Sequence, residues 1–480
     1  MNINTPLKVL AESNAPEIMR VFDRQRETAL RWRTSSAAER VARIKKLHDA
    51  VLDNRDRIRE AGYKDFRKPP EEVDIGEILP VISEARDAMR HLGKWMKPTH
   101  VMPTRLMWGT RSWIKHEPKG RCLIISPWNY PVNLTFGPLV SCLAAGNTAI
   151  VKPSEMTPNL SDLMTKILRE LFADNEVAVF QGETPVATAL LELPFDHIFF
   201  TGSPAVGKIV MAAAAKHLTS VTLELGGKSP TIVDKDADVK LAAQGTVWGK
   251  FTNGGQTCIA PDHVFVHTEI KQAFIAECAA ALKSAYGETS EQQLNSPMLT
   301  RMVNAAHTRR VGALLDDAKS HGARVLAGGA VDVAQCFVQP TLLESMPPDA
   351  KIAGDEIFGP VLPIIEFSDL EQVITRINAQ PKPLALYVWG KDRARLDQVI
   401  NNTSSGGVCI NNCVVQFLHG SLPFGGVNNS GFGNAHGWYG FRAFSHERPV
   451  VRTHVMAARF FFAPYTALTR WILNLMIKIT

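Results

Sequence analysis

Apolar residues recur at helical spacing near the N-terminus and gather in short runs later in the chain. Ser36 and Glu39 have the spacing of a capping box, and apolar residues follow at positions 41, 44, 47 and 51, so we predict an amphipathic helix there. From Arg121 onward, short apolar runs alternate with helical segments. This alternation predicts a mostly parallel sheet that helices cover on both faces.

The apolar runs form two series, which we interpret as two doubly wound α/β domains. The runs are CLIIS, NTAIVK, VAVFQ, HIFF and VTLEL in the first series, and PTIV, HVFVH, FVQPTLL, VLPIIEF, LALYVWG and GGVCIN in the second. We assign residues 1–97 and 119–224 to the first domain and residues 225–412 to the second. Residues 98–118 and 413–450 fit neither series, and we expect them to form an arm that packs against another subunit.

Charge and cysteine content argue against several classes of protein. The 53 basic and 47 acidic residues give a net charge of +6 and are spread along the chain, without the basic stripe that nucleic-acid binding needs. The seven cysteines lack the paired spacing of a disulfide framework or a zinc site, so we expect no metal and a reducing compartment. The N-terminus has no basic segment followed by an apolar run, and we predict a cytoplasmic protein.

One cysteine lies among residues that cannot bury it. The stretch FTNGGQTCIAPD places Cys258 shortly after Gly254 and Gly255. Cysteine is usually a core residue, whereas glycines let the backbone turn sharply and approach other groups closely. We infer that this thiol is presented to a ligand.

A turn between a strand and a helix is a candidate phosphate site. HIFFTGSPAVGKIV runs from an apolar strand through Gly202 and Ser203 into a helix with Val206 and Gly207 in its first turn. Free N–H groups and the positive end of a helix dipole suit a pyrophosphate. The stretch lacks the three glycines of the usual dinucleotide motif, so a plain strand-to-helix turn is the alternative.

Other polar side chains stand next to predicted strands. They are Asn129 after CLIIS, Lys152 and Glu155 after NTAIV, Glu224 at the end of VTLEL, and Glu356 with Phe358 in DEIFGPVLPI. Ligands bind at the carboxyl edge of such sheets, where an amide can donate to an oxyanion, a carboxylate can hold ribose hydroxyls, and a buried carboxyl group can act as a base. Taken singly, each of these residues is equally compatible with an ordinary turn or solvated loop.

Taken together, the motifs resemble those of the aldehyde dehydrogenase superfamily. They are PWNYP, IVKPSE, FTGSPAVGKIV, VTLELGGKSP, NGGQTCIAPD, DEIFGPVLPI and SLPFGG, in this order, and the resemblance extends from about Ala37 to Arg448. The residues of these motifs are most similar to those of the class 3 branch, which includes fatty, benzaldehyde and coniferyl aldehyde dehydrogenases. The resemblance implies an α/β fold with a variant Rossmann cofactor domain, a catalytic domain and a small oligomerisation arm, assembled as a homodimer.

The resemblance also implies roles for individual residues. In the family, the cysteine that matches Cys258 is the nucleophile, the asparagine that matches Asn129 helps to bind the oxyanion, and the glutamate that matches Glu224 activates the hydrolytic water. The glutamate that matches Glu356 holds the nicotinamide ribose and has been considered as the base in class 3. Lys152 and Glu155 would flank the adenosine ribose of NAD, with NADP as the alternative cofactor. The expected cofactor site therefore consists of Lys152, Glu155, Gly202, Ser203, Val206, Glu356 and Phe358.

Three aromatic residues and one substitution concern the substrate. Tyr63, Tyr130 and Trp248 are candidates for an apolar substrate tunnel, although each is equally compatible with the core. Relatives usually read PFGGVGNSG where this chain has PFGGVNNSG, so Asn428 replaces a glycine. Asparagine tolerates a left-handed backbone better than most residues, which leaves the loop feasible.

The last residues of the chain form an amphipathic pattern. Within residues 456–480, polar side chains recur every four positions from Thr466 to Lys478, while apolar ones line another face. The segment is too short and too often interrupted to span a membrane. It is typical of a helix that lies in a membrane interface, and the alternative is a helix docked on its own protein or on a dimer partner.

The combined prediction is NAD(P)-dependent oxidation of a lipophilic aldehyde, long-chain or aromatic, to a carboxylic acid through a thiohemiacetal and a thioester on Cys258. A coenzyme A-acylating enzyme is one rival, although such enzymes typically lack a carboxylate at the position of Glu224. A non-catalytic scaffold with the same fold is the other.

Overall fold

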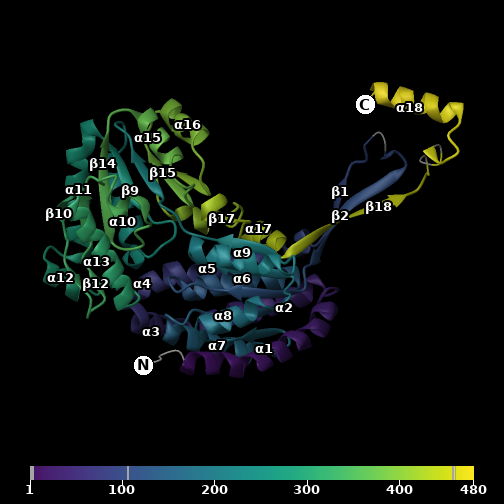
Figure 1. Cartoon of the computed structure of the whole chain (residues 1–480), viewed down its shortest axis with the longest axis horizontal. Helices are drawn as coiled ribbons and strands as arrows, with labels where there is room; N and C mark the ends of the chain where they lie inside the picture. The colour runs from purple at the N-terminus through teal and green to yellow at the C-terminus, as the bar shows by residue number, and fades with distance from the viewer. Residues whose placement is uncertain (1–4, 105–106, 457–458, 460, 480) are drawn as a thin grey trace.

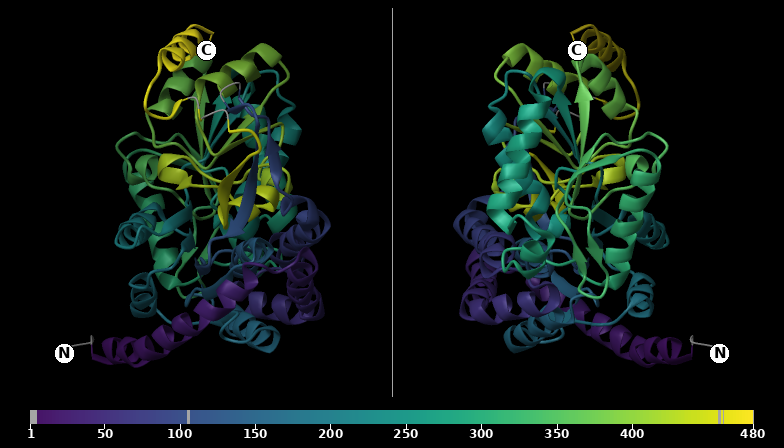
Figure 2. Two further views of the ribbon diagram at one scale, coloured as in Figure 1. Left: turned by 90° about the vertical axis from the view of Figure 1, so that its right-hand side faces the viewer. Right: turned by 90° about the vertical axis from the view of Figure 1, so that its left-hand side faces the viewer.

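The computed structural model describes residues 5–104, 107–456, 459 and 461–479. Figure 1 shows two α/β bodies side by side and a thin arm that leaves them and ends in a separate helix. The N-terminal helix α1 (Thr5–Trp32) and the C-terminal helix α18 (Ala467–Ile479) lie at opposite ends of the molecule in the views of Figures 1 and 2.

The first body is built on a sheet with the strand order β17-β7-β6-β3-β4-β5, parallel except for β17. Its strands are β3 (Arg121–Ile125), β4 (Thr148–Lys152), β5 (Val177–Val179), β6 (His197–Thr201), β7 (Ser220–Glu224) and β17 (Gly431–Phe432). Its helices, besides α1, are α2 (Ala37–Asp53), α3 (Arg55–Phe66), α4 (Pro70–Val73), α5 (Leu79–Trp95), α6 (Pro131–Ala145), α7 (Pro158–Leu171), α8 (Thr184–Leu191) and α9 (Pro204–Ala215), with a π-helical turn, Asp74–Ile78, before α5.

The strands of this sheet are apolar throughout because both faces are covered. Along β3, Cys122 and Ile124 pack with α2, α5, α6 and α7, whereas Leu123 and Ile125 pack with α1, α8 and α9. The predicted capping box also forms, since the Ser36 hydroxyl accepts the Glu39 N–H and the Glu39 carboxylate accepts the Ser36 N–H. Local sequence signals therefore suffice for this part of the fold.

The second body has the strand order β10-β13-β14-β9-β8-β15-β16, parallel except for β10. Its strands are β8 (Pro230–Val233), β9 (His263–His267), β10 (Arg324–Ala327), β13 (Thr341–Glu344), β14 (Val361–Phe367), β15 (Ala385–Trp389) and β16 (Gly407–Ile410). Its helices are α10 (Val239–Phe251), α11 (Lys271–Tyr286), α12 (Ser290–Asn295), α13 (Ala305–Ser320), α14 (Lys351–Gly354), α15 (Leu370–Asn378) and α16 (Arg393–Asn402).

One predicted run in this body is wrong as a single strand. FVQPTLL divides into β12 (Phe337–Val338), which pairs with β11 (Val331–Asp332), and β13, which joins the large sheet. Pro340 lies between them and has no N–H for a sheet hydrogen bond, so the run is interrupted there.

The arm is a three-stranded antiparallel sheet in the order β1-β2-β18. Its strands are β1 (Thr99–Val101), β2 (Thr110–Pro118) and β18 (Ser445–Thr453). Of the range 413–450 that we expected in the arm, only the part from Ser445 onward joins this sheet. The residues before it return to the first body: β17 pairs with β7, and α17 (Gly437–Ala443) inserts Phe441 into the core there. Burial of such aromatic side chains keeps this segment off the arm.

Helix α18 stands beyond the tip of the arm and is largely exposed (Figure 1). Leu468, Trp471 and Leu475 on it are 57%, 62% and 44% exposed. Among the helices of the described residues, none has the length and apolar character needed to cross a bilayer.

Candidate active site

Three motifs far apart in the sequence meet where the two bodies face each other. Glu224 ends β7 and pairs in register with Thr201 of β6 on one side and Gly431 of β17 on the other. Cys258 follows α10 and a short 3-10 turn, Thr252–Gly255. Glu356 follows α14 of the second body. Their convergence confirms that polar groups gather at the carboxyl edge of the first sheet, where α/β proteins bind ligands.

Two glycines make this convergence sterically feasible. A Cβ on Gly255, whose φ is +74°, would lie 2.4 Å from the carbonyl oxygen of Gly359. The loop of Cys258 and the EIFGP loop therefore contact each other through backbone atoms. A Cβ on Gly226 would lie 2.4 Å from a carboxylate oxygen of Glu356. Only glycine allows these approaches, because real Cβ atoms do not come that close.

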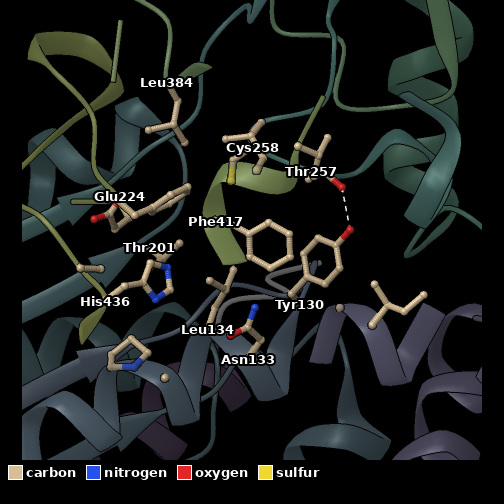
Figure 3. Close-up of a pocket in the computed structure, with 18 of the residues that line it drawn as sticks. Tyr130, Asn133, Leu134, Thr201, Glu224, Thr257, Cys258, Leu384, Phe417 and His436 are labelled. Carbon is tan, nitrogen blue, oxygen red and sulfur yellow. Dashed lines mark hydrogen bonds between the residues drawn. The ribbon is translucent and has the colours of Figure 1, made fainter. Parts of the chain in front are cut away.

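The thiol of Cys258 faces a cavity of about 1130 Å³, a volume that includes the part of the cavity open to solvent. Figure 3 shows its sulfur pointing into the space next to Phe417 and Tyr130, with Glu224 and His436 at the opposite side. Most lining side chains are apolar or aromatic. They include Ile75, Tyr130, Leu134, Pro138, Phe199, Trp248, Leu384, Val414, Phe417 and Phe424.

Of the three aromatic residues that we expected in the substrate tunnel, two line the cavity. Tyr130 also hydrogen-bonds the Thr257 hydroxyl at 2.9 Å (Figure 3), and Trp248 lies on α10. Tyr63 lies on α3, is 55% exposed, and is not among the described residues that line the cavity. Its place on the outer face of a helix follows from the periodicity of α3, in which Ile58 and Phe66 are buried instead.

Glu224 is buried without a protein partner. Within the described chain, neither of its carboxylate oxygens has a hydrogen-bond donor, and the neighbouring Thr201 hydroxyl is also unpaired. Burial raises the pKa of Glu224 well above its usual value because it disfavours the charged form. A buried carboxyl group left without donors costs stability, which is typical of a group retained for chemistry.

The surroundings of Cys258 act against ionisation. Burial raises the pKa of its thiol to about 12, and the charges of Glu356 and Glu224 act in the same direction, while the backbone N–H groups of Cys258 and Ile259 lower it. The thiol is protonated at neutral pH unless further positive charge or a proton acceptor arrives.

The loop of Glu356 is held by residues that the sequence analysis missed. Arg310 donates to the carbonyl oxygens of Glu356, Ile357 and Phe358, and a carboxylate oxygen of Asp262 accepts the Ile357 N–H at 2.9 Å. Burial raises the pKa of Glu356 to about 7, partly offset by a hydrogen bond from the Gly227 backbone. Arg310 belongs to none of the motifs, and Asp262 ends the NGGQTCIAPD motif without a role that the sequence reveals, because the partners of both are backbone groups distant in the sequence.

Asn129 connects the PWNYP and cysteine motifs. Its buried amide donates to the carbonyl oxygen of Gln256 at 3.0 Å, and its own carbonyl accepts from Asn253 and from Lys68. Lys68 in turn forms a fully buried ion pair with Glu77, whose other oxygen accepts the first N–H groups of α6. Asn129 is not among the described residues that line the cavity.

The expected cofactor residues lie along the same edge of the first sheet. Lys152 is buried at the end of β4 and forms a 2.6 Å ion pair with the partly exposed Glu155. Ser203 caps α9 and accepts the Val206 N–H at 3.4 Å, and the Gly202 N–H bonds to the Glu224 carbonyl. Phe358 packs edge-on against Trp128 with a φ of +44°.

A dinucleotide fits this edge. In the described chain, the hydroxyl groups of Ser126 and Thr201, at or just beyond the ends of β3 and β6, are buried without hydrogen-bond partners. Unpaired hydroxyls next to a helix N-terminus and a lysine–glutamate pair provide the donors and acceptors that phosphates and ribose need.

The loop that contains Asn428 keeps a glycine-like backbone. Asn428 has a φ of +55°, in the left-handed region, as its substitution for a glycine led us to expect. The Ser430 carbonyl that follows accepts the Leu225 N–H at 3.1 Å, so this loop supports the end of the strand that bears Glu224.

The chain is similar to many known proteins. It is 46% identical to "Putative aldehyde dehydrogenase AldX" of Bacillus subtilis over 90% of this chain and 97% of the relative. It is 41% identical to "4,4'-diaponeurosporen-aldehyde dehydrogenase" of Staphylococcus aureus, over 87% and 90%. It is 40% identical to "Aldehyde dehydrogenase, dimeric NADP-preferring" of Rattus norvegicus, over 88% and 92%.

Solved structures agree with these relatives. "Substrate bound state of Staphylococcus Aureus AldH" superposes with a TM-score of 0.90 at 38% identity, covering 96% of this chain and 99% of that one. "Crystal structure of PnpE in complex with Nicotinamide adenine dinucleotide" superposes with a TM-score of 0.83 at 27% identity, covering 92% and 90%.

The family assignment follows from most of the length of the chain. The relatives include "Aldehyde dehydrogenase family 3 member A2" of Mus musculus, 42% identical over 78% of this chain and 75% of the relative, in keeping with the class 3 branch. The family model matches residues 4–450. With a thiol and a buried carboxyl group on one cavity beside a dinucleotide-binding edge, the chain belongs to the aldehyde dehydrogenase family and is an NAD(P)-dependent enzyme.

Proposed function

We propose that this enzyme oxidises lipophilic aldehydes to carboxylic acids by covalent catalysis at Cys258, with Glu224 as the base for hydrolysis. The observation that carries the proposal is that the Cys258 thiol and the unpartnered Glu224 carboxyl group line one cavity whose other walls are mainly apolar. An apolar cavity favours aldehydes with alkyl or aryl bodies, since burying them is the main source of binding free energy.

The chemistry begins when the Cys258 thiol gives its proton to a neighbouring carboxylate, a role that we assign to Glu356, and the resulting thiolate adds to the aldehyde carbon. We assign the N–H of Cys258 as a donor to the thiohemiacetal oxyanion. The family resemblance adds the Asn129 amide, which here donates to the Gln256 carbonyl oxygen and would have to direct its second N–H into the cavity. When bound, NAD or NADP supplies a positively charged ring that accepts a hydride. Loss of that hydride from the substrate carbon leaves a thioester on Cys258.

Hydrolysis of the thioester requires a base that can still accept a proton although it is buried. The raised pKa of Glu224 makes its carboxylate a stronger proton acceptor than an exposed glutamate, so it can take a proton from the attacking water. The C–S bond then breaks, the carboxylic acid leaves, and the proton returns to the thiolate or to solvent. Glu356, with a pKa of about 7, is the second carboxyl group able to exchange protons here.

A coenzyme A-acylating reaction is the alternative fate of the thioester. It needs no hydrolytic base, and the presence of buried Glu224 at the cavity favours hydrolysis. Turnover that depends on added coenzyme A would support the acylating reaction instead. A non-catalytic scaffold is excluded by any aldehyde-dependent gain of absorbance at 340 nm.

We also propose a homodimer and a membrane-associated tail. Strand β18 is an edge strand of the arm, so its outer backbone groups are open to a second subunit. On α18, Leu468, Trp471 and Leu475 lie on one face and remain exposed, and Arg470 and Lys478 supply positive charge. This combination suits the interface of an anionic membrane and would concentrate the enzyme near lipophilic aldehydes.

The pH dependence of thiol alkylation tests the electrostatics around Cys258. We expect iodoacetamide labelling of Cys258 to rise roughly tenfold per pH unit between about pH 7 and about pH 10, because the thiolate is the reactive form and its pKa lies higher still. Glu356→Gln removes a negative charge that opposes ionisation and should speed labelling above about pH 7. Peptide mass spectrometry gives both rates, with the partly exposed Cys336 as the internal reference. Slower labelling of Cys258 in the variant would refute this account.

Substitutions separate the two chemical steps. Cys258→Ala should abolish cofactor reduction, whereas Glu224→Gln should keep a pre-steady-state burst of reduced cofactor and lose steady turnover, because the thioester forms but is not hydrolysed. Stopped-flow absorbance at 340 nm measures both phases. Cys336→Ala, which removes a thiol outside the cavity, is the control and should behave as wild type. Normal turnover in Cys258→Ala would remove the nucleophile assignment.

Aldehydes of different chain length test whether the apolar cavity binds the substrate. We expect kcat/KM to increase about fourfold per buried CH₂, from about 0.8 kcal/mol each, until the cavity is filled. Propanal, hexanal, hexadecanal, benzaldehyde and coniferyl aldehyde are compared with NAD and NADP. Trp248→Ala should reduce kcat/KM for the long and aromatic aldehydes and spare propanal, and Trp108→Ala, at a 69% exposed tryptophan of the arm, should affect none. Equal kcat/KM across the series would contradict the proposal.

Vesicle binding tests the tail. The full chain should sediment with phosphatidylglycerol vesicles, and a chain that ends at Met456 should not. The double substitution Trp471→Ser/Leu475→Ser should weaken binding because it removes the apolar face, while Leu52→Ser, at a 40% exposed leucine of α2, serves as the matched control. If the full and shortened chains partition equally, the tail has another role.

A further inference from the structure

A second cavity lies in the second body, on the other face of its sheet from α10. Phe265 of β9 points to this face with α13 and α15, whereas Val264 and Val266 point to the face of α10 and α11. The cavity has a volume of about 730 Å³. Gln380 and Pro381 at its rim are exposed, so it opens to solvent. No step of the aldehyde reaction uses it.

The wall of this cavity combines positive charge with apolar surface. Its charged and titratable lining residues are Lys228, His263 and Arg376, and none of the aspartates or glutamates that the structure describes lines it. The rest is almost entirely apolar, namely Pro230, Phe265, Met346, Pro348, Ala353, Gly354, Ile377, Pro381 and Pro383, with Gln380. A cavity with this composition matches a molecule that has one negative group and a small apolar body.

Arg376 is the cation left without a partner. In the part of the chain that the structure describes, its guanidinium forms no ion pair and no hydrogen bond, and it lies over the face of Phe265, 5.5 Å from the ring centroid. A partly buried guanidinium normally pairs with carboxylates through its fixed fork of N–H groups. Its five donors are therefore available to an anion in the cavity.

Lys228 differs because its ammonium group is already engaged. It donates to Asp262 at 2.6 Å and to the carbonyl oxygens of Ile352 and Asp355 at 2.9 and 2.8 Å. Asp262 also contacts His263 Nδ1 at 3.2 Å and accepts the Ile357 N–H. Arg376 is therefore the group available to recognise a ligand. The cavity is also lined by Ala353 and Gly354, which directly precede the loop that carries Glu356.

We propose that this cavity is a binding site for a small organic carboxylate, with the carboxylate on Arg376 and the apolar body along Phe265, Met346 and Ile377. An inorganic phosphate is a poorer match, because a single free cation and apolar walls leave most of its oxygens without donors. The site does not depend on the proposed aldehyde reaction. It would sense carboxylic acids, the class of compound that aldehyde oxidation produces, next to the support of the Glu356 loop.

The test uses the full-length protein labelled with [methyl-¹³C]methionine, because Met346 lines this cavity and no methionine lines the cavity of Cys258. Met346→Leu identifies the resonance. Octanoate should shift the Met346 signal saturably, and 1-octanol, which has the same apolar body without the charge, should bind at least about tenfold more weakly, as expected for loss of a charge-assisted hydrogen-bond pair.

Two substitutions and a control complete the test. Arg376→Gln should weaken octanoate binding about tenfold or more, and Arg376→Lys, which keeps the charge, should retain most of it. Arg393→Gln, at a 94% exposed side chain on α16, removes the same charge outside the cavity and should change nothing. The other methionine signals report whether each variant is folded. An unmoved Met346 signal, equal binding of octanol, or undiminished binding in folded Arg376→Gln would each overturn the proposal.

Discussion

The active site depends on the removal of water from carboxyl groups that stand beside a thiol. Glu224, Glu356 and Cys258 are all buried enough that burial is the largest cause of their raised pKa values. The charges of Glu356 and Glu224 also disfavour the thiolate of Cys258. Keeping these three groups buried together costs stability, because each has lost the water that would stabilise its charged form.

That arrangement requires close contact between segments that belong to two bodies. Gly255 brings the cysteine loop against the backbone of the EIFGP loop, and Gly226 lies against the carboxylate of Glu356. Arg310 and Asp262 fix the loop of Glu356 through its carbonyl and N–H groups. On the other side, the buried Lys68–Glu77 pair ties the first turn of α6 to the carbonyl of Asn129. A buried pair is expensive to break, since either partner alone would leave an uncompensated charge. The catalytic geometry therefore rests on fully paired polar contacts around a small set of unpaired ones.

The unpaired groups are where ligands are expected. Glu224 and the Thr201 hydroxyl lack partners at the main cavity, and Arg376 lacks one at the second. Most buried polar groups in folded proteins are satisfied. At these two places unpaired polar groups coincide with cavities, one where the two bodies face each other and one within the second body.

The sequence by itself determined most of the secondary structure and the motifs. Apolar runs and caps are local signals, so the alternation of strands and helices and the capping box at Ser36 could be foreseen. Tertiary structure alone decided which groups are buried or paired: the Asn129 amide on Gln256, the return of residues before Ser445 to the first body, and the free guanidinium of Arg376. These outcomes depend on contacts between residues far apart in the chain. A local sequence pattern does not show which side chains lose contact with water, and that loss is what shifts their pKa values.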